Sequence, residues 1–313
     1  MEMKHLRGAF TQEIEKLALN DKTIFTLATD SRGSVTLSDF AKHIPGQFVE
    51  CGIAEQDAVG IAAGLANAGL RPFVCGPACF FSMRSAEQVK VDVAYSHTNV
   101  KIIGVSGGVS YGALGSTHHS TQDIALMRAI PGIEVYIPSD AVQMTALTDY
   151  LAASDSAAYV RVGRGPVPVF YDENARFVPG KAVKLKEGSD GAIIACGEMV
   201  YPALQAAEKL QNEGLSFSVY DMFSIKPLDT EAILEAAKTG FIITAEEHSI
   251  YGGLGGAVSE VLAQNRPVPM TIMGLPDEKT YPGTSAEVMS HYGLTCDGIH
   301  DRAVEGLKRW RSI

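Results

Sequence analysis

Residues 47–76 read QFVECGIAEQDAVGIAAGLANAGLRPFVCG, and this segment carries the strongest indication of the fold class. Gln47–Cys51 and Pro72–Gly76 are short apolar runs of the kind that form buried strands. Between them, Ile53–Ala68 is almost entirely small or apolar, which predicts a buried helix packed against a sheet or another chain. A strand, a helix and a second strand at this spacing are typical of a parallel sheet covered by helices.

The same alternation runs through most of the chain and predicts an α/β fold. Further strands are predicted at Thr23–Thr29, Val100–Ser106, Ile133–Ile137, Ala158–Val162, Ala192–Cys196, Ser216–Asp221, Phe241–Glu246 and Val268–Gly274. Further helices are predicted at Ser85–Tyr95, Ala141–Ala152, Tyr201–Glu213, Thr230–Thr239 and Asp301–Trp310.

A break in this alternation divides the chain. Pro166–Asp190 contains three prolines, mixed charge and no helical period, which predicts an interdomain connector with a short hairpin. We therefore expect two domains, residues 1–167 and 189–313, joined by a linker at 168–188. Each domain is expected to be a mostly parallel sheet covered by helices.

Charge and composition exclude several classes of function. The 313 residues include 26 Lys and Arg against 36 Asp and Glu, for a formal net charge of −10. This balance argues against broad binding to nucleic acid or to anionic membranes. The N-terminus lacks the apolar core of a signal peptide, and no apolar run reaches the ~20 residues that span a bilayer. With five widely spaced cysteines, an odd number, we expect reduced thiols in a soluble cytoplasmic protein.

Glu55 lies in the first turn of the predicted apolar helix. An acidic residue there stabilises the helix through its macrodipole by ~0.3–1 kcal/mol, which is a purely structural explanation. A carboxylate beside a dry apolar surface would instead have a raised pKa and could share a proton with a ligand nitrogen. The residues alone leave both interpretations open.

The segment Ser106–His119, SGGVSYGALGSTHH, is a glycine-rich loop that follows a predicted strand. Such loops bind ligands in open α/β sheets, and His118 and His119 could transfer protons near neutral pH. An ordinary surface loop is the alternative. Gly108–Gly112 also matches the Gly-x-Ser-x-Gly pattern of serine hydrolases, but no helical pattern follows it, which disfavours a serine nucleophile.

Two pairs of side chains lie near other strand ends. Phe80 and Phe81 are either core residues or rings that stack on a flat heterocycle. The forked guanidinium groups of Arg161 and Arg164 suit phosphate or carboxylate groups of a substrate, and salt bridges between the domains explain them equally well.

Five segments together resemble the thiamine-diphosphate enzymes of the transketolase family: Gly52–Gln56, Phe80–Phe81, Gly115–His118, Pro138–Asp140 and Glu246–Gly253. The resemblance spans essentially the whole chain but only the C-terminal half of a full transketolase. It implies a pyrimidine-binding domain followed by the C-terminal domain. The domain that binds the diphosphate and its metal ion is missing, so the chain looks like the smaller subunit of a split transketolase.

The resemblance also implies a reaction, a cofactor and a partner. A transketolase transfers a two-carbon ketol unit from a ketose phosphate to an aldose phosphate. The cofactor would be thiamine diphosphate, with Mg²⁺ or Ca²⁺ bound by the partner chain and no metal ligand on this one. The partner would be an N-terminal transketolase subunit, in a heterotetramer of two plus two chains. This chain would be inactive alone.

Several residues match positions with known roles in the family. Glu55 matches the glutamate that protonates the aminopyrimidine ring of the cofactor and so activates it. Phe81 resembles the ring that stacks on the pyrimidine, although a slip of one position would transfer that role to Phe80. Arg84 resembles an arginine of the deoxyxylulose-phosphate synthase branch, and His118 matches the histidine that handles substrate hydroxyl protons.

The resemblance is weaker for the substrate contacts. Arg7, Ser34 and Arg164 loosely resemble sugar-phosphate contacts, and Asp30 an acid near the substrate channel. Leu114 occupies a position where the family often has an acid that contacts a substrate hydroxyl, so the usual sugars cannot be assumed.

Three other functions compete with a two-chain transketolase. The β subunit of a 2-oxoacid dehydrogenase shares this domain pair, but the Gly115–His118 and Ile53–Gln56 segments favour transketolase. Deoxyxylulose-phosphate synthase normally keeps its domains on one chain. A structural subunit without catalytic function is disfavoured because both Glu55 and His118 are present.

Overall fold

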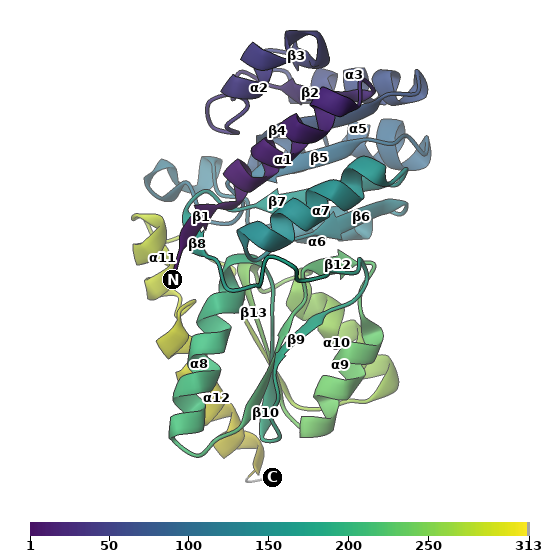
Figure 1. Ribbon diagram of the computed structural model, residues 1–313. Coiled ribbons are helices and arrows are strands. Elements are labelled where there is room, and N and C mark those ends of the chain that lie inside the picture. The colour runs from purple at the N-terminus through teal and green to yellow at the C-terminus, as the bar shows by residue number, and fades with distance from the viewer. Residues whose placement is uncertain (312–313) are drawn as a thin grey trace.

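The computed structural model describes residues 1–311 and contains two α/β units, one above the other in Figure 1. The upper unit is built on a seven-stranded sheet and the lower unit on a five-stranded sheet. All ten predicted strands are present, with ends within a few residues of the predicted ones. The predicted fold class is confirmed.

The first sheet has the order β12-β6-β7-β5-β4-β2-β3. Its strands pair in parallel except for β12, which is antiparallel to β6. Their bounds are β2 (Ile24–Ala28), β3 (Phe48–Glu50), β4 (Arg71–Pro77), β5 (Lys101–Val105), β6 (Ile133–Tyr136), β7 (Ala157–Val162) and β12 (Ser224–Lys226).

Helices cover both faces of this sheet because its central strands are apolar on both sides. Ile103 faces one side and packs in a cluster with residues of α1 and α7. Ile102 faces the other side and packs with residues of α3, η2 and α6. The bounds are α1 (Leu6–Asn20), α3 (Glu55–Asn67), the π-helical η2 (Val89–Tyr95), α6 (Asp123–Ala129) and α7 (Ala141–Ala153). Three shorter helices are α2 (Ser38–His43), α4 (Ala78–Met83) and α5 (Ala86–Gln88).

The second sheet has the order β14-β13-β10-β11-β9, with only β9 antiparallel to its neighbour. Helices α8 and α12 cover one face and α9 and α10 the other (Figure 1). The strands are β9 (Val183–Lys186), β10 (Gly191–Ala195), β11 (Phe217–Asp221), β13 (Ile242–Ser249) and β14 (Met270–Leu275). The helices are α8 (Val200–Asn212), α9 (Thr230–Ala236), α10 (Leu254–Asn265), α11 (Ser285–His291) and α12 (Cys296–Arg311).

The connector differs from the prediction, because it forms no hairpin. Its first extended piece, β8 (Pro166–Pro168), pairs antiparallel with β1 (Met3–His5) at the N-terminus. Its second, β9, joins the sheet of the second unit through β11. The expected hairpin was wrong because each piece finds a partner that is distant in sequence.

The two units also share an edge, which the sequence pattern did not predict. Strand β12 follows β11 in the chain but pairs with β6 of the first sheet, Ser224 opposite Tyr136. The second unit therefore contributes a strand to the first.

Two further observations concern the whole chain. Within residues 1–311, none of the helices combines the length and hydrophobicity that crossing a bilayer requires. All five cysteines are free thiols, and Cys75, Cys79 and Cys196 are buried.

Candidate active site

The predicted site residues gather where four neighbouring strands end. Asp30 follows β2, Phe80 follows β4, His118 lies in the loop after β5, and Arg164 follows β7. These strands are adjacent in the sheet and parallel, so their carboxyl ends lie along one edge. Ligands in open α/β sheets bind at this edge.

Glu55 begins α3 with its side chain only 4% exposed. Its Oε2 accepts a hydrogen bond of 3.0 Å from Nη1 of Arg84, which is 48% exposed. The Arg84 guanidinium also lies 3.9 Å from the centre of the Phe80 ring, a cation–π contact. One arginine therefore holds both the buried carboxylate and the aromatic ring in place.

From Phe80 the contacts continue through aromatic rings. Phe80 meets the His118 imidazole edge-on at 5.4 Å between ring centres, and His118 meets Tyr111 at 5.3 Å. The Arg164 guanidinium lies 5.0 Å from the centre of the Tyr111 ring. His118 Nδ1 also lies 2.9 Å from Thr117 Oγ1, a hydrogen bond that limits the rotation of the imidazole.

Arg7 lies close enough to Arg164, the last residue of this row, for the two charges to interact. Its Nη1 donates a 2.7 Å hydrogen bond to the backbone carbonyl of Ser34. Burial lowers the pKa of Arg7, and the nearby charge of Arg164 lowers it further. Two guanidinium groups that repel each other would both gain from an anion between them.

Asp30 lies at the other end, near the start of α3. It is exposed, has a left-handed backbone (φ 54°), and its backbone N–H donates a 2.7 Å hydrogen bond to Glu50 Oε1. The same oxygen accepts a 3.3 Å hydrogen bond from the backbone of Gly52. Glu50 thereby holds the turn after β2 beside the segment that leads to Glu55.

Two of the predicted residues lie apart from this row. Phe81 is fully buried, and a Cβ at Gly76 would lie 2.4 Å from its ring. Phe80 is the half-buried ring of the pair. Arg161 is 5% exposed; its Nε lies 3.6 Å from Asp123 Oδ2, and its Nη2 donates to the backbone carbonyl of Glu247.

Of the two explanations given for Arg161, the geometry shows the salt bridge between domains. Asp123 belongs to the first unit and Glu247 to the second. Burial opposes the charged form of Arg161, but Asp123 and Glu247 raise its pKa above the ordinary value. Arg161 therefore carries its charge inside the protein.

The Gly-x-Ser-x-Gly match does not form a nucleophile elbow. Ser110 Oγ donates a 2.6 Å hydrogen bond to the backbone carbonyl of Gly107 rather than to a histidine. A 3₁₀ segment, η3 (Gly112–Thr117), follows it in place of an α-helix. His119 is also directed inward, with Nε2 2.9 Å from the backbone carbonyl of Gly112.

Sequence reasoning missed Tyr111, which links His118 to Arg164 in the row of contacts. The available signal was a large aromatic residue within a glycine-rich loop. Beside the row, Ile53, Ala54, Glu55, Gln56, Asp57 and Arg84 line an open hollow of about 570 Å³. Among residues 1–311, no group of three or more His, Cys, Asp or Glu side chains is arranged to hold a metal ion.

Comparisons with known proteins agree with this architecture. Residues 2–169 match the family model for the transketolase pyrimidine-binding domain, and residues 180–299 match that for the transketolase C-terminal domain. A solved split-gene transketolase, an inactive β4 tetramer, is 36% identical with a TM-score of 0.89. That likeness covers 99% of this chain and 100% of the other.

Two curated relatives are subunits of transketolases. One of them, from the apulose-4-phosphate transketolase of Phocaeicola vulgatus, is 56% identical over 305 residues, 97% of each chain. The other, from the 6-deoxy-6-sulfo-D-fructose transketolase of Clostridium sp., is 37% identical, covering 99% of this chain and 96% of the relative. With both domain models matched in the expected order, the chain belongs to the transketolase family.

Proposed function

We propose that this chain is the pyrimidine-binding subunit of a two-chain transketolase, which transfers a two-carbon ketol unit from a ketose phosphate to an aldose phosphate. The observation that carries the proposal is the unbroken row of contacts from Glu55 through Arg84, Phe80 and His118 to the basic end of the site. One end of this row suits a nitrogen heterocycle and the other suits a phosphate.

The donor set around Glu55 fits the pyrimidine half of thiamine diphosphate. Because Arg84 engages Oε2 of Glu55, the second oxygen, Oε1, is the one that would hold a proton at a ring nitrogen. The half-buried Phe80 ring offers a flat apolar face next to Arg84, which lines the hollow. The buried Phe81 ring packs α4 against β4. When bound, thiamine diphosphate supplies the nucleophilic carbon that none of these side chains provides.

The other end of the row would handle the sugar. His118 would take and return the proton of a substrate hydroxyl next to the bond that breaks, because it is half-exposed and oriented by Thr117. Arg7 and Arg164 would hold the terminal phosphate, with Ser34 beside them. Asp30 would contact hydroxyl groups near the mouth of the site. Arg161 is left out of this assignment because it is buried at the domain contact.

The relatives suggest which ketose to test first. One relative is named for apulose 4-phosphate and another for 6-deoxy-6-sulfo-D-fructose, and each of these sugars carries a terminal anion. The paired arginines are consistent with such a group. Leu114, which is 55% exposed and lies in η3 four residues before His118, cannot accept a hydrogen bond from a substrate hydroxyl as an acid would. We therefore propose apulose 4-phosphate as the donor.

The proposed assembly is a heterotetramer of two plus two chains in the cytoplasm. The N-terminal transketolase subunit would bind the diphosphate and its Mg²⁺ or Ca²⁺. A related β chain forms an inactive β4 tetramer, which supports the expectation that this chain is inactive alone. We also propose residues 1–167 and 189–313 as the functional domains, although β12 adds to the first sheet from within the second.

The competing functions have less support. The two relatives described above, which match over nearly the full length of both chains, are transketolase subunits, so the β subunit of a 2-oxoacid dehydrogenase is not supported. A subunit without catalytic function would have no need for a buried acid and a half-exposed histidine in one row with paired arginines.

Calorimetric titration of thiamine diphosphate with Mg²⁺ tests the proposal, using this chain alone and purified with its partner. We expect binding only in the complex, together with conversion of apulose 4-phosphate and an aldose phosphate detected by product mass. Binding by the single chain would show that the partner is not needed for the cofactor. A complex that binds the cofactor but converts no ketose phosphate would exclude ketol transfer.

A further inference from the structure

The loop that carries His118 is held from both domains. We define the His118 loop as residues 108–120, and its two ends are joined by reciprocal backbone hydrogen bonds. Gly108 N–H donates to the Ser120 carbonyl at 2.9 Å, and Ser120 N–H donates to the Gly108 carbonyl at 2.7 Å. From the second unit, the backbone N–H of Ser249 in β13 donates to the Thr121 carbonyl at 2.8 Å.

Glu247, also in β13, reaches into the loop itself. Its side chain is 6% exposed, and Oε1 accepts a 2.7 Å hydrogen bond from the backbone N–H of Val109. The neighbouring Gly108 has φ +60°, and a Cβ there would lie 2.4 Å from Glu247 Oε1. The loop therefore needs glycine at this position to let the carboxyl group approach.

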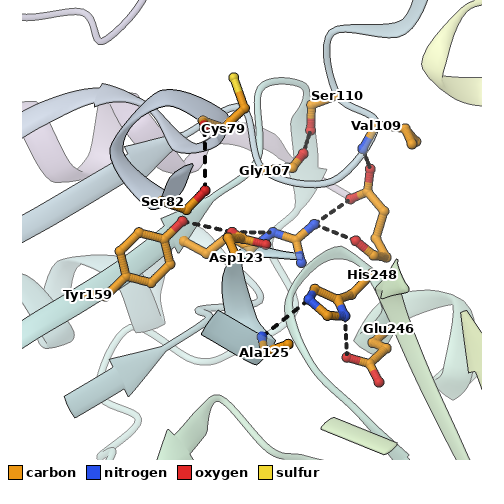
Figure 2. Close-up of polar contacts among 12 residues, drawn as sticks. Cys79, Ser82, Gly107, Val109, Ser110, Asp123, Ala125, Tyr159, Glu246 and His248 are labelled. Atoms are coloured by element: carbon orange, nitrogen blue, oxygen red, sulfur yellow. Dashed lines mark hydrogen bonds and ion pairs between the residues drawn. The ribbon is translucent and has the colours of Figure 1, made fainter. Parts of the chain in front are cut away.

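The Glu247 backbone is itself fixed, because Arg161 Nη2 donates to its carbonyl oxygen. Arg161 Nε faces Asp123 Oδ2, which accepts a 2.7 Å hydrogen bond from the Tyr159 hydroxyl. Figure 2 shows this series of contacts, from Tyr159 and Asp123 on one side to the Val109 backbone on the other. Arg161 of β7, supported by Asp123 of α6, therefore fixes the position of Glu247, and Glu247 in turn fixes the His118 loop.

A second contact lies at the far side of the loop. A Cβ on Gly112 would lie 2.8 Å from the backbone nitrogen of Ser285, at the start of α11. His119 Nε2 is hydrogen-bonded to the Gly112 carbonyl at 2.9 Å. The second unit therefore touches the loop at Val109 and at Gly112, on either side of the segment that places Tyr111 against His118.

We propose that Glu247 is a positioning residue for ketol transfer: its hydrogen bond to Val109 fixes the loop that presents His118 to the substrate. The inference rests on the proposed function and gives the C-terminal domain a role in it. Glu247 touches neither cofactor nor substrate in this assignment. It acts through the loop backbone, and a small displacement of a catalytic group is enough to slow a reaction.

Glu198 provides a matched control. It lies in η4 (Gly197–Met199) and, with Glu247 and Arg161, lines a small cavity of about 20 Å³, room for one water molecule. Its Oε1 is buried and has no hydrogen-bond partner within the described part of the chain. Glu198→Gln makes the same chemical change in the same cavity as Glu247→Gln, at an oxygen that is not hydrogen-bonded to the loop.

Two substitutions of Glu247 separate its carboxyl chemistry from its length. Glu247→Asp keeps a carboxyl group on the Arg161 side but withdraws the oxygen from Val109 by one methylene group. Glu247→Gln keeps an oxygen acceptor at full length and removes the ionisable carboxyl group. If positioning is the role, the glutamine variant functions and the aspartate variant does not.

The test uses the complex with the partner chain and measures two quantities. Hydrogen exchange of the peptide that contains Val109 reports on the loop, and steady-state kinetics report kcat and KM with cofactor affinity. For Glu247→Asp we expect faster exchange and a kcat lower by about tenfold to a hundredfold, with unchanged cofactor affinity. For Glu247→Gln and Glu198→Gln we expect the exchange rate of the loop and kcat to stay within about threefold of wild type.

Other outcomes each have one meaning. An active aspartate variant beside an impaired glutamine variant would show that Glu247 acts through its ionisable carboxyl group beside Arg161, and would overturn the proposal. Unchanged loop exchange in Glu247→Asp would overturn it too. A wild-type complex without ketol transfer would instead overturn the proposed function, whatever the exchange of the loop.

Discussion

At the scale of single residues, the site is organised by side chains that each contact two neighbouring side chains. Arg84 donates to Glu55 and stacks on Phe80, and His118 lies between Phe80 and Tyr111. Because each contact restrains the next, substitutions along this row are expected to affect different steps of one reaction.

Glu55→Gln is expected to lower kcat of the assembled complex by about 10²–10⁴-fold, the usual contribution of a general acid or base. Glutamine keeps the shape of the side chain but cannot deliver a proton. The measurement is ketose turnover, with circular dichroism and gel filtration to show an intact complex. Glu87→Gln, an exposed change on α5, is the control. A Glu55→Gln complex with near-full turnover would remove Glu55 from the mechanism.

The two phenylalanines make opposite predictions. Phe80→Leu is expected to raise the Kd for thiamine diphosphate by about two- to tenfold, the effect of a lost ring stack. Phe81→Leu is expected to lower the Tm and leave that Kd unchanged, because Phe81 is fully buried. Calorimetry on both variant complexes decides between them. The reverse result would assign the stacking ring to Phe81.

Arg7→Ala is expected to raise KM for a phosphorylated ketose by about tenfold to a hundredfold, since a hydrogen-bonded charge pair with the phosphate is lost. The same variant should leave KM for the unphosphorylated sugar unchanged, and this pair of substrates is the control. An equal rise for both sugars would mean that Arg7 supports the fold around Ser34 and not the phosphate.

At the scale of elements, the short helix α4 is held against β4 by a close approach. Gly76, in β4, leaves room for the Phe81 ring of α4, whose Cε2 would lie 2.4 Å from an added Cβ. The fit places Phe80 on the outer side of the same helix, beside the hollow. The position of α4, which carries Phe80, therefore depends on the absence of a side chain at Gly76.

Gly76→Ala is expected to lower stability by about 1–3 kcal/mol through overpacking and to weaken cofactor binding as α4 moves outward. Thermal unfolding of the single chain gives the first quantity, and calorimetry on the complex the second. Gly46→Ala is a fair control, since a Cβ there meets no atom within 4 Å. An unchanged Tm for Gly76→Ala would show that Phe81 can move aside without cost.

At the scale of the whole molecule, buried acids lie between the two units. Burial raises the pKa of Glu247 to about 8, with a further contribution from the negative charge of Glu198. Burial likewise raises the pKa of Glu198. Arg161 opposes this rise for both acids, and Asp123 adds to it for Glu247. Between the ordinary pKa of a glutamate and the raised values in the folded protein, Glu247 and Glu198 therefore bind protons that the unfolded chain releases.

The stability conferred by these acids should fall as pH rises. The folded pKa of Glu247 exceeds its ordinary value of 4.5, so its contribution is complete below about pH 4.5 and is lost as pH rises to about 8. Glu198→Gln removes one charge and lowers the pKa of Glu247. We expect the Tm of the variant, relative to wild type, to increase from pH 5 to pH 8. A difference that is constant across this range would contradict the assignment.

Much of this molecule follows from its sequence alone. Apolar runs of five to seven residues predicted every strand of the two parallel series, because a strand buried on both faces needs apolar side chains throughout. Phe80, His118 and Arg164 lie in the segments that follow predicted parallel strands, which placed them at one sheet edge, since parallel strands end together. The family, and with it the expected role of Glu55, followed from short motifs.

How these elements pack against one another depends on contacts between residues that are distant in the sequence. The sequence pattern could not tell that Phe80 is half-exposed while Phe81 is buried, because the two rings differ only in which neighbours surround them. It left Arg161 open between substrate and salt bridge, and it missed the crossing of β12 into the first sheet. The contact between Val109 and Glu247 joins residues 138 positions apart. Local periodicity encodes which face of an element is buried, whereas such pairings depend on sheet order and domain packing.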